Sequence, residues 1–114
     1  MIMDIYAASL ARIRHLGARR IRALICAFGG AEQAWKSSDD DMTEALLRSE
    51  TAGEHTARRA SLERKHIDPE QEGRLMEKHH VRCCTFLDSD YPPLLASTSN
   101  PPAVLFCKGA EPVW

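Results

Sequence analysis

"YPPLLASTSNPPAVLFCKG" occupies residues 91–109 and holds four of the six prolines in this chain of 114 residues. Between its two Pro-Pro pairs lies the apolar pair Leu94-Leu95, and after the second pair comes the strand-like run Ala103–Cys107. Proline fixes φ and favours an extended residue before it, so this stretch is a stiff connection that aims a strand in a set direction. Within it we expect one helical turn, beginning at Pro92 and capped by Asp90.

A second strand is expected just before this stretch, over Val81–Leu87, which is rich in β-branched, aromatic and thiol side chains. Two strands alone do not form a stable sheet in water. Either they pack as a ribbon on helices, or they belong to a sheet whose other strands lie outside this chain. The backbone groups of Ala103–Cys107 need partners in both cases, so we expect the chain to dimerise, to exchange strands or to fold the ribbon back on the helices.

The residues before the strands show apolar side chains at spacings of three and four, which predicts a series of small helices. The expected ranges are Ile2–Leu16, Ala18–Phe28, Ala31–Trp35, a helix capped within Ser38–Asp41 that contains Met42 to Leu47, Glu54–His66, and a helix capped by Asp68 that ends near His79-His80. The sequence therefore predicts a mainly α fold, with a helical domain over residues 1–80 followed by a strand-containing segment over 81–114.

Composition is that of a globular protein, with 44% apolar and 27% charged residues. There is no apolar run of about 18 residues and no pattern of a secretion signal, so we expect no membrane span and a cytoplasmic location. The cysteines Cys26, Cys83, Cys84 and Cys107 have no CxxC spacing, which favours reduced and mostly buried thiols.

Charge is unevenly distributed although the net charge is only −1. Residues 1–36 hold six basic side chains against two acidic ones, whereas residues 37–70 hold nine acids against five bases. A basic first third indicates either a surface that faces an anion or a solvated helix face.

The turn His15-Leu16-Gly17-Ala18 is the candidate for such a surface. In helix-hairpin-helix motifs a Gly-h-Gly turn brings backbone N–H groups and a helix N-terminus to a phosphate. Gly17 matches the second glycine and His15 replaces the first. Basic side chains follow the turn and add charge-assisted contacts. The candidate DNA-binding residues are Leu16, Gly17, Ala18, Arg19, Arg20 and Arg22; a structural hairpin and a protein-binding surface are the alternatives.

Two stretches together resemble the N-terminal part of the bacterial DNA-processing protein A (DprA/Smf) family. They are LARIRHLGARRIRALICAFGGAEQAW, residues 10–35, and DPEQEGRLMEKHHVRCCTFLDSDYPPLLASTSNPPAVLFCKG, residues 68–109. The most specific element is the order strand, Asp-x-x-Tyr-Pro-x-x-Leu, short spacer, Pro-Pro-x-Val-Leu-Phe, Lys-Gly over Asp88–Gly109. Residues 39–67 match in character only.

This resemblance implies a helical domain similar to sterile-alpha-motif or helix-hairpin-helix folds, followed by the lead-in to a Rossmann-like domain that binds single-stranded DNA. Family members protect incoming single strands in natural transformation and help to load the RecA recombinase; they are not known as enzymes. The glycine-containing start of the Rossmann-like domain is not in this sequence, so the two strands would form the edge of a sheet lying elsewhere. The chain itself is then a positioning or interaction module, and a stand-alone helix-hairpin-helix DNA-binding module is the alternative.

Catalytic and metal-binding patterns are not found in the sequence. It contains no GxSxG, no phosphate loop and no HExxH. The stretch His79–Cys84 suggests a metal, but strand alternation places Cys83 and Cys84 on opposite faces. The acidic run Asp39–Asp41 is expected to begin a helix, where it interacts favourably with the helix dipole. We therefore expect no catalytic residue, no metal and no cofactor.

Overall fold

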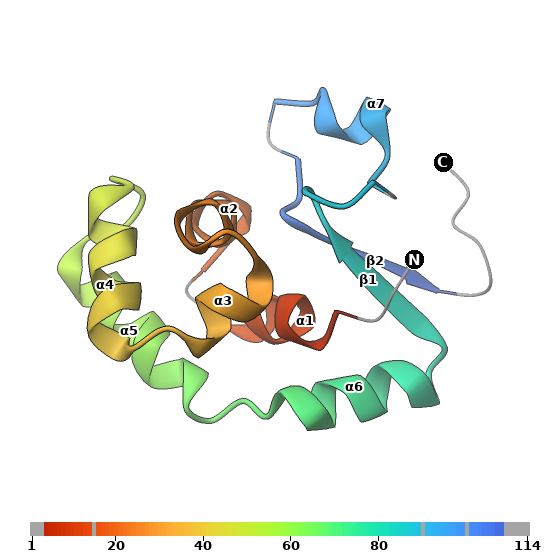
Figure 1. Ribbon diagram of the computed structural model, residues 1–114, viewed down its shortest axis with the longest axis horizontal. Helices are drawn as coiled ribbons and strands as arrows, with labels where there is room; N and C mark the ends of the chain where they lie inside the picture. Colours follow the sequence, from red (N-terminus) through yellow and green to blue (C-terminus); the bar gives the residue numbers. More distant parts are fainter. Residues whose placement is uncertain (1–3, 15, 90, 100, 109–114) are drawn as a thin grey trace.

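The computed structural model describes residues 4–14, 16–89, 91–99 and 101–108. These residues form seven helices and one two-stranded antiparallel sheet. In Figure 1 the first six helices lie to the left and below, the sheet lies to the right, and the last, short helix lies above the sheet. The elements are α1 (Ile5–Arg12), α2 (Ala18–Phe28), α3 (Ala31–Lys36), α4 (Asp39–Arg48), α5 (Glu54–Arg64), α6 (Pro69–Lys78), β1 (Val81–Thr85), α7 (Pro93–Ala96) and β2 (Val104–Lys108). The prediction of a mainly helical domain followed by two short strands is confirmed. In the part of the chain described, no helix combines the length and apolar character that crossing a membrane requires.

Local capping explains why α4 and α6 begin where the sequence predicts. Ser38 caps α4 by accepting a hydrogen bond from the Asp41 N–H at 3.1 Å, and Asp68 caps α6 by accepting from the Glu70 N–H at 3.0 Å. Gly29 ends α2 in the left-handed conformation, with φ of 85°, which costs glycine little. These signals act within a few residues, so they can be read from the sequence.

The first helix departs from its prediction, since α1 ends at Arg12 and not at Leu16. Ile13 is extended, with φ −71° and ψ 119°. The Arg14 N–H then donates to Glu63 Oε2 on α5 at 2.9 Å, 49 residues away in the sequence. This tertiary bond satisfies a backbone group that a longer helix would have used internally, and the described residues between α1 and α2 form a linker.

The helical core is built around α1, which packs against α3 and α6, while α2 packs against α3 and α4. Leu10, Leu24 and Leu46 are completely buried in it. A Cβ added to Gly73 of α6 would lie 2.8 Å from Ile5 Cγ2, closer than any normal contact. The absence of a side chain at Gly73 therefore allows α6 to approach α1 this closely.

A polar cluster connects α5 to the start of α4. The Arg64 guanidinium, whose side chain is only 9% exposed, donates to Trp35 O at 3.1 Å and to Ser37 Oγ at 3.3 Å. It also donates to Asp39 Oδ1 at 2.6 Å. Buried arginine requires such partners because an unpaired charge is costly away from water. The cluster fixes the angle between α3, α4 and α5.

Asp39 gives this cluster a pH dependence. Hydrogen bonds from Lys65, Ser61 and Arg64 hold the pKa of its carboxyl well below its usual range. A carboxyl whose pKa is lowered in the folded state stabilises the fold above its unfolded pKa of about 4, and this stabilisation is lost as pH falls further. We expect the urea midpoint to decrease below about pH 4, and Asp39→Asn to flatten that decrease. Asp40→Asn, in the same helical turn and exposed, is the matched control; identical acid profiles for the two variants would contradict the assignment.

The two strands pair with each other, with Cys83 opposite Phe106 and Cys84 opposite Leu105. The sheet contacts α1 and α6, so the ribbon folds back on the helices, which was one of the three expected outcomes. On the helical side Cys83 is completely buried and its Sγ donates to Asp4 O at 3.1 Å. Burial raises the pKa of Cys83 to about 12. This thiol therefore stays neutral inside the core.

Both strand boundaries differ slightly from the sequence prediction. β1 ends at Thr85 and not at Leu87. The Thr85 N–H donates a hydrogen bond to Asp88 Oδ2 at 2.7 Å, and the Asp88 N–H donates one to Thr85 O at 3.0 Å. These two bonds close a turn. β2 begins one residue late, at Val104.

The proline-rich connection between the strands is held on the helical domain. Arg22 of α2 lies over the Phe86 ring, 5.6 Å from its centroid, and donates a hydrogen bond to Pro101 O. The Tyr91 hydroxyl donates to Pro102 O at 2.6 Å. α7 begins at Pro93, with Pro92 as its N-cap; Asp90, the expected cap, lies outside the described residues. The connection is thus held by contacts at both of its ends, at Phe86 and at Pro101-Pro102.

All four cysteines are thiols. Cys83, Cys84 and Cys107 are buried, whereas Cys26 is exposed on α2. Burial also raises the pKa of Cys107. The expectation of mostly buried thiols is confirmed for these three positions.

Candidate nucleic-acid interface

The turn before α2 is open to solvent at its backbone. Gly17 is the N-cap of α2, its backbone is extended with φ 172° and ψ 176°, and no side chain caps the helix. A Cβ added to Gly17 would meet no atom within 4 Å. Leu16 is buried, with 5% exposure, and anchors the turn in the core. The first N–H groups of α2 therefore face an open surface, where a helix carries partial positive charge.

A concavity of about 260 Å³ lies at this helix start, lined by Leu16, Gly17, Ala18, Arg19, Arg20 and Thr51. Five of the six candidate residues thus meet at one place. Arg20 Nε donates to Thr51 O at 2.7 Å, which joins the turn to the segment after α4. Arg19 is exposed beside it. Sequence reasoning missed Thr51, because it lies 31 residues from Arg20 and carries no recognisable motif.

The sixth candidate, Arg22, lies elsewhere, since its guanidinium contacts Phe86 and Pro101 in the proline-rich connection. The turn is also longer than a tight Gly-h-Gly turn, because α1 already ends at Arg12. His15, which replaces the first glycine, lies outside the described residues.

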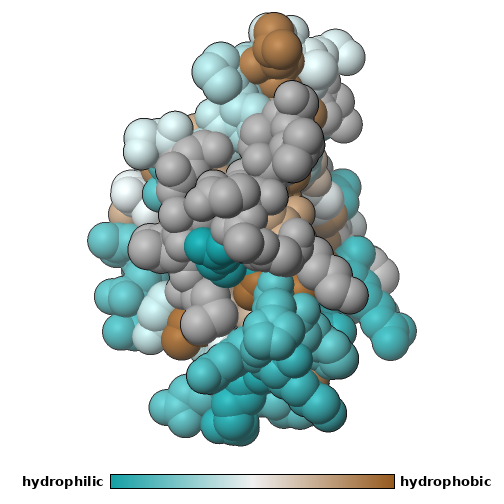
Figure 2. Space-filling model, turned by 90° about the vertical axis from the view of Figure 1, so that its right-hand side faces the viewer, coloured by the Kyte–Doolittle hydropathy of each residue, from teal (hydrophilic) through white to brown (hydrophobic). Residues whose placement is uncertain are grey.

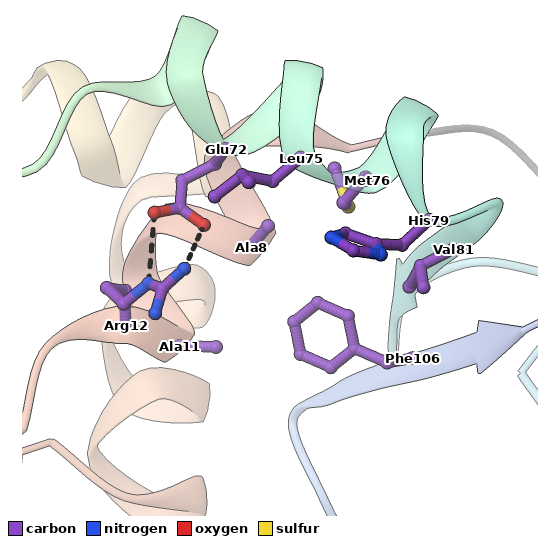
Figure 3. Close-up of a pocket in the computed structure, with 9 residues that line it drawn as sticks. All are labelled: Ala8, Ala11, Arg12, Glu72, Leu75, Met76, His79, Val81 and Phe106. Atoms are coloured by element: carbon purple, nitrogen blue, oxygen red, sulfur yellow. Dashed lines mark hydrogen bonds and ion pairs between the residues drawn. The ribbon is translucent and has the colours of Figure 1, made fainter.

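Two further concavities lie along α1 on the side of β2. One of about 430 Å³ is lined by parts of residues 11–21 together with Pro102, Ala103 and Val104. The other, of about 390 Å³, lies between α1, α6 and the ribbon, and Figure 3 shows its lining side chains. Ala11 and Arg12 line both, so the two concavities are neighbours along α1, and we call the pair the α1 groove.

The end of the α1 groove nearest α6 is mostly apolar. Leu75, Met76 and Phe106 face it from α6 and β2 (Figure 3), and Phe106 is 47% exposed. The Arg12 guanidinium closes one side through two bonds to Glu72, Nε–Oε1 at 2.9 Å and Nη2–Oε2 at 3.0 Å. Its hydrogen bond with Glu72 raises the pKa of Arg12, so this arginine is paired with a neighbouring carboxylate.

A different apolar surface lies at α7. One apolar group projects at the top of Figure 2, over α7, among paler and more hydrophilic residues, whereas the end formed by α6 is hydrophilic. Leu94 of α7 is 84% exposed and Leu87 is 56% exposed. Exposed apolar side chains of this size are common at contact surfaces.

The two adjacent thiols of β1 face opposite sides of the ribbon, as their cross-strand partners Phe106 and Leu105 show. Within residues 4–14, 16–89, 91–99 and 101–108, no group of three His, Cys, Asp or Glu side chains is arranged to hold a metal ion.

Comparisons with protein-family models, with curated proteins and with solved structures found no match to this chain.

Proposed function

We propose that this chain is the helical accessory domain of a DprA-like protein that binds single-stranded DNA, protects it and aids its loading with RecA. In this role the chain positions a neighbouring DNA-binding domain and offers a surface to protein partners. The proposal is supported by the order of a helical domain, a proline-rich connection and a strand whose outer edge receives no hydrogen bond from the described residues, and it does not require catalysis.

The observation that carries this proposal is the way in which the proline-rich connection between β1 and β2 is held. Arg22 and Tyr91 hold Pro101 and Pro102 by hydrogen bonds to their carbonyl oxygens. Because these residues immediately precede β2, they fix the direction in which the strand runs beside the helices. A strand presented in this way suits the task of fixing a second domain relative to the first.

The test combines the chain with a purified Rossmann-like domain from a DprA-family protein. We expect calorimetry to detect association, and the domain to bind a fluorescent oligothymidylate severalfold more tightly or more weakly when the chain is present. The chain alone should bind the oligonucleotide much more weakly than the domain does. Absence of association, or equal DNA affinity of the chain and the domain, would overturn the proposal.

A second candidate function is direct contact with DNA phosphates at the start of α2. It is favoured by the concavity in which the uncapped N-terminus of α2 and the exposed Arg19 meet. A phosphate there would accept hydrogen bonds from backbone N–H groups and charge-assisted bonds from arginine. Binding of this kind weakens steeply with salt.

Gly17→Ser separates this DNA contact from fold stability. A serine hydroxyl would accept a hydrogen bond from the first turn of α2, so we expect the free energy of unfolding to rise by about 0.3 kcal/mol, the usual difference between glycine and serine at an N-cap. The same hydroxyl would occupy the position of a phosphate oxygen, so oligonucleotide binding should become weaker. Urea denaturation and fluorescence anisotropy measure the two effects. Increased stability with unchanged DNA affinity would exclude the turn as a DNA contact.

Arg19→Glu tests the charge at the same place. We expect severalfold weaker oligonucleotide binding at low salt and a reduced dependence on salt concentration, because one phosphate contact becomes a repulsion. Arg59→Glu, at an exposed position on α5, changes the net charge equally and is the matched control. Equal losses in both variants would show a nonspecific effect of net charge.

A further inference from the structure

The outer edge of β2 presents backbone groups that point away from β1. The Phe86 N–H donates to Ala103 O at 3.1 Å, and Thr85 is opposite Val104. Because bonded positions alternate in an antiparallel ladder, residues 103, 105 and 107 bond to β1, whereas Val104 and Phe106 direct their N–H and C=O groups outward. No hydrogen bond from another described residue reaches these outward groups. They form a template for another extended strand.

The α1 groove lies beside this edge. Phe106 lines its apolar end, and Val104 lines its other end. Residues two apart in a strand are separated by about 6.8 Å and point to the same face. A strand added to β2 would therefore direct one side chain toward the apolar end and a second, two residues away, toward the end at Val104.

Basic groups line the end of the groove at Val104, and the Glu63 carboxylate accepts a hydrogen bond from the Arg14 N–H beside it. Arg14 lines it and is exposed; its hydrogen bond to Glu63 uses the backbone N–H and not the guanidinium. Gly17 and Ala18 also line it, so it includes the uncapped start of α2. No acidic residue is among its described lining residues. A carboxylate is the side-chain group that complements this charge.

We propose that β2 and the α1 groove bind an extended strand of a protein partner that carries an apolar residue opposite Phe106 and an acidic residue, two positions away, opposite Val104. Main-chain hydrogen bonds to Val104 and Phe106 supply affinity, and the two ends of the groove supply specificity. This inference rests on the proposed role as an interaction module and names the chemistry of the partner. A second copy of the chain fits less well, because β2, Val-Leu-Phe-Cys-Lys, offers no acidic residue.

The test uses an array of threonine-rich heptapeptides that carry valine and glutamate two positions apart, in both orders, because the direction of the added strand is open. The control set replaces glutamate with lysine. We expect binding of one glutamate order at least tenfold stronger than its lysine counterpart. Equal binding of the two sets, or no binding at millimolar peptide, would overturn the proposal.

N-methylation of the best peptide separates strand addition from other modes. An added strand bonds to β2 through alternate amides only, so methylating one alternate set should abolish binding and methylating the other should leave it nearly unchanged. The Val104 and Phe106 amides should also become protected from hydrogen exchange when the peptide binds. Equal effects of both methylated sets, or protection elsewhere, would contradict strand addition at β2.

Charge reversal in the protein tests the acidic preference. Arg14→Glu should invert the preference from the glutamate peptide to the lysine peptide, whereas Arg59→Glu on α5 should leave it unchanged.

Two other occupants can be distinguished. If the chain dimerises with increasing concentration in analytical ultracentrifugation and Val104→Pro abolishes this dimerisation, the occupant is a second copy and the proposal is overturned. Displacement of the peptide by oligothymidylate would assign the positive end to phosphate instead. The association and DNA assays with the Rossmann-like domain are independent of these peptides, so failure here leaves the proposed function standing.

Discussion

Replacing Arg64 with alanine is expected to lower the free energy of unfolding by about 3 kcal/mol, which is the usual effect of breaking a buried charged cluster. The side chain is almost fully buried and joins Trp35 O, Ser37 Oγ and Asp39 Oδ1. Its removal leaves the carbonyl and hydroxyl without their donor and creates a cavity. Urea denaturation followed by circular dichroism measures the loss.

Two further variants give this prediction its controls. Arg64→Lys keeps the charge but loses the planar fork of donors, so most of the loss should remain. Arg58→Ala removes an exposed arginine of the same helix that pairs with Glu54 at i,i+4, and it should change stability by no more than about 0.5 kcal/mol. Similar effects of Arg64→Ala and Arg58→Ala would mean that the cluster does not hold the helices together.

Replacing Arg22 with alanine is expected to release the proline-rich connection at a cost of about 2 kcal/mol. The variant loses the contact with the Phe86 ring and the hydrogen bond to Pro101 O, and each contributes about 1 kcal/mol or more. Because the loss is local, hydrogen exchange of the Phe86 amide, which bonds to Ala103 O, should accelerate by about 30-fold.

The control for this release is Arg19→Ala, at an exposed position of the same helix, which should leave exchange of the Phe86 amide unchanged. Tyr91→Phe removes the second bond that holds the connection, from the tyrosine hydroxyl to Pro102 O, and should accelerate the same amide by a smaller factor. If Arg22→Ala accelerates amides of α2 as strongly as that of Phe86, the residue stabilises the helix and not the connection.

The parts of the fold that follow from the sequence are those fixed by local chemistry. Ser38 and Asp68 begin helices through bonds to N–H groups two or three residues away, and Gly29 ends one through its own conformational freedom. The alternation of Cys83 and Cys84 across the ribbon also follows from strand geometry alone. Such features do not depend on which segments meet in the fold.

The parts that the sequence did not predict depend on long-range partners. The end of α1 depends on Glu63. Arg64 belongs to the expected helix Glu54–His66, and no pattern in that helix predicts that its side chain is buried. Arg22 was assigned to the turn by its position in the chain, whereas the fold directs it to Phe86. Composition and periodicity carry no information about such pairings.

The sequence predicted the residues of the turn before α2 that line the candidate site, but it did not predict the residues that other segments contribute. Leu16, Gly17 and Arg19 are neighbours in the chain, so their meeting at one concavity required no knowledge of the fold. Thr51 and the α1 groove come from segments distant in sequence. A sequence pattern of consecutive residues cannot reveal them.

The arrangement of the thiols makes the natural sequence suitable for site-specific labelling. Cys83, Cys84 and Cys107 are buried, and burial raises the pKa of Cys83 and Cys107, so a maleimide at neutral pH meets an accessible sulfur at Cys26. Cys26 lines the depression between α2 and α4 and none of the α1 groove. A fluorophore attached there leaves the outer edge of β2 unobstructed. Energy transfer from this fluorophore to a dye on a bound strand would give the orientation of that strand without engineered cysteines.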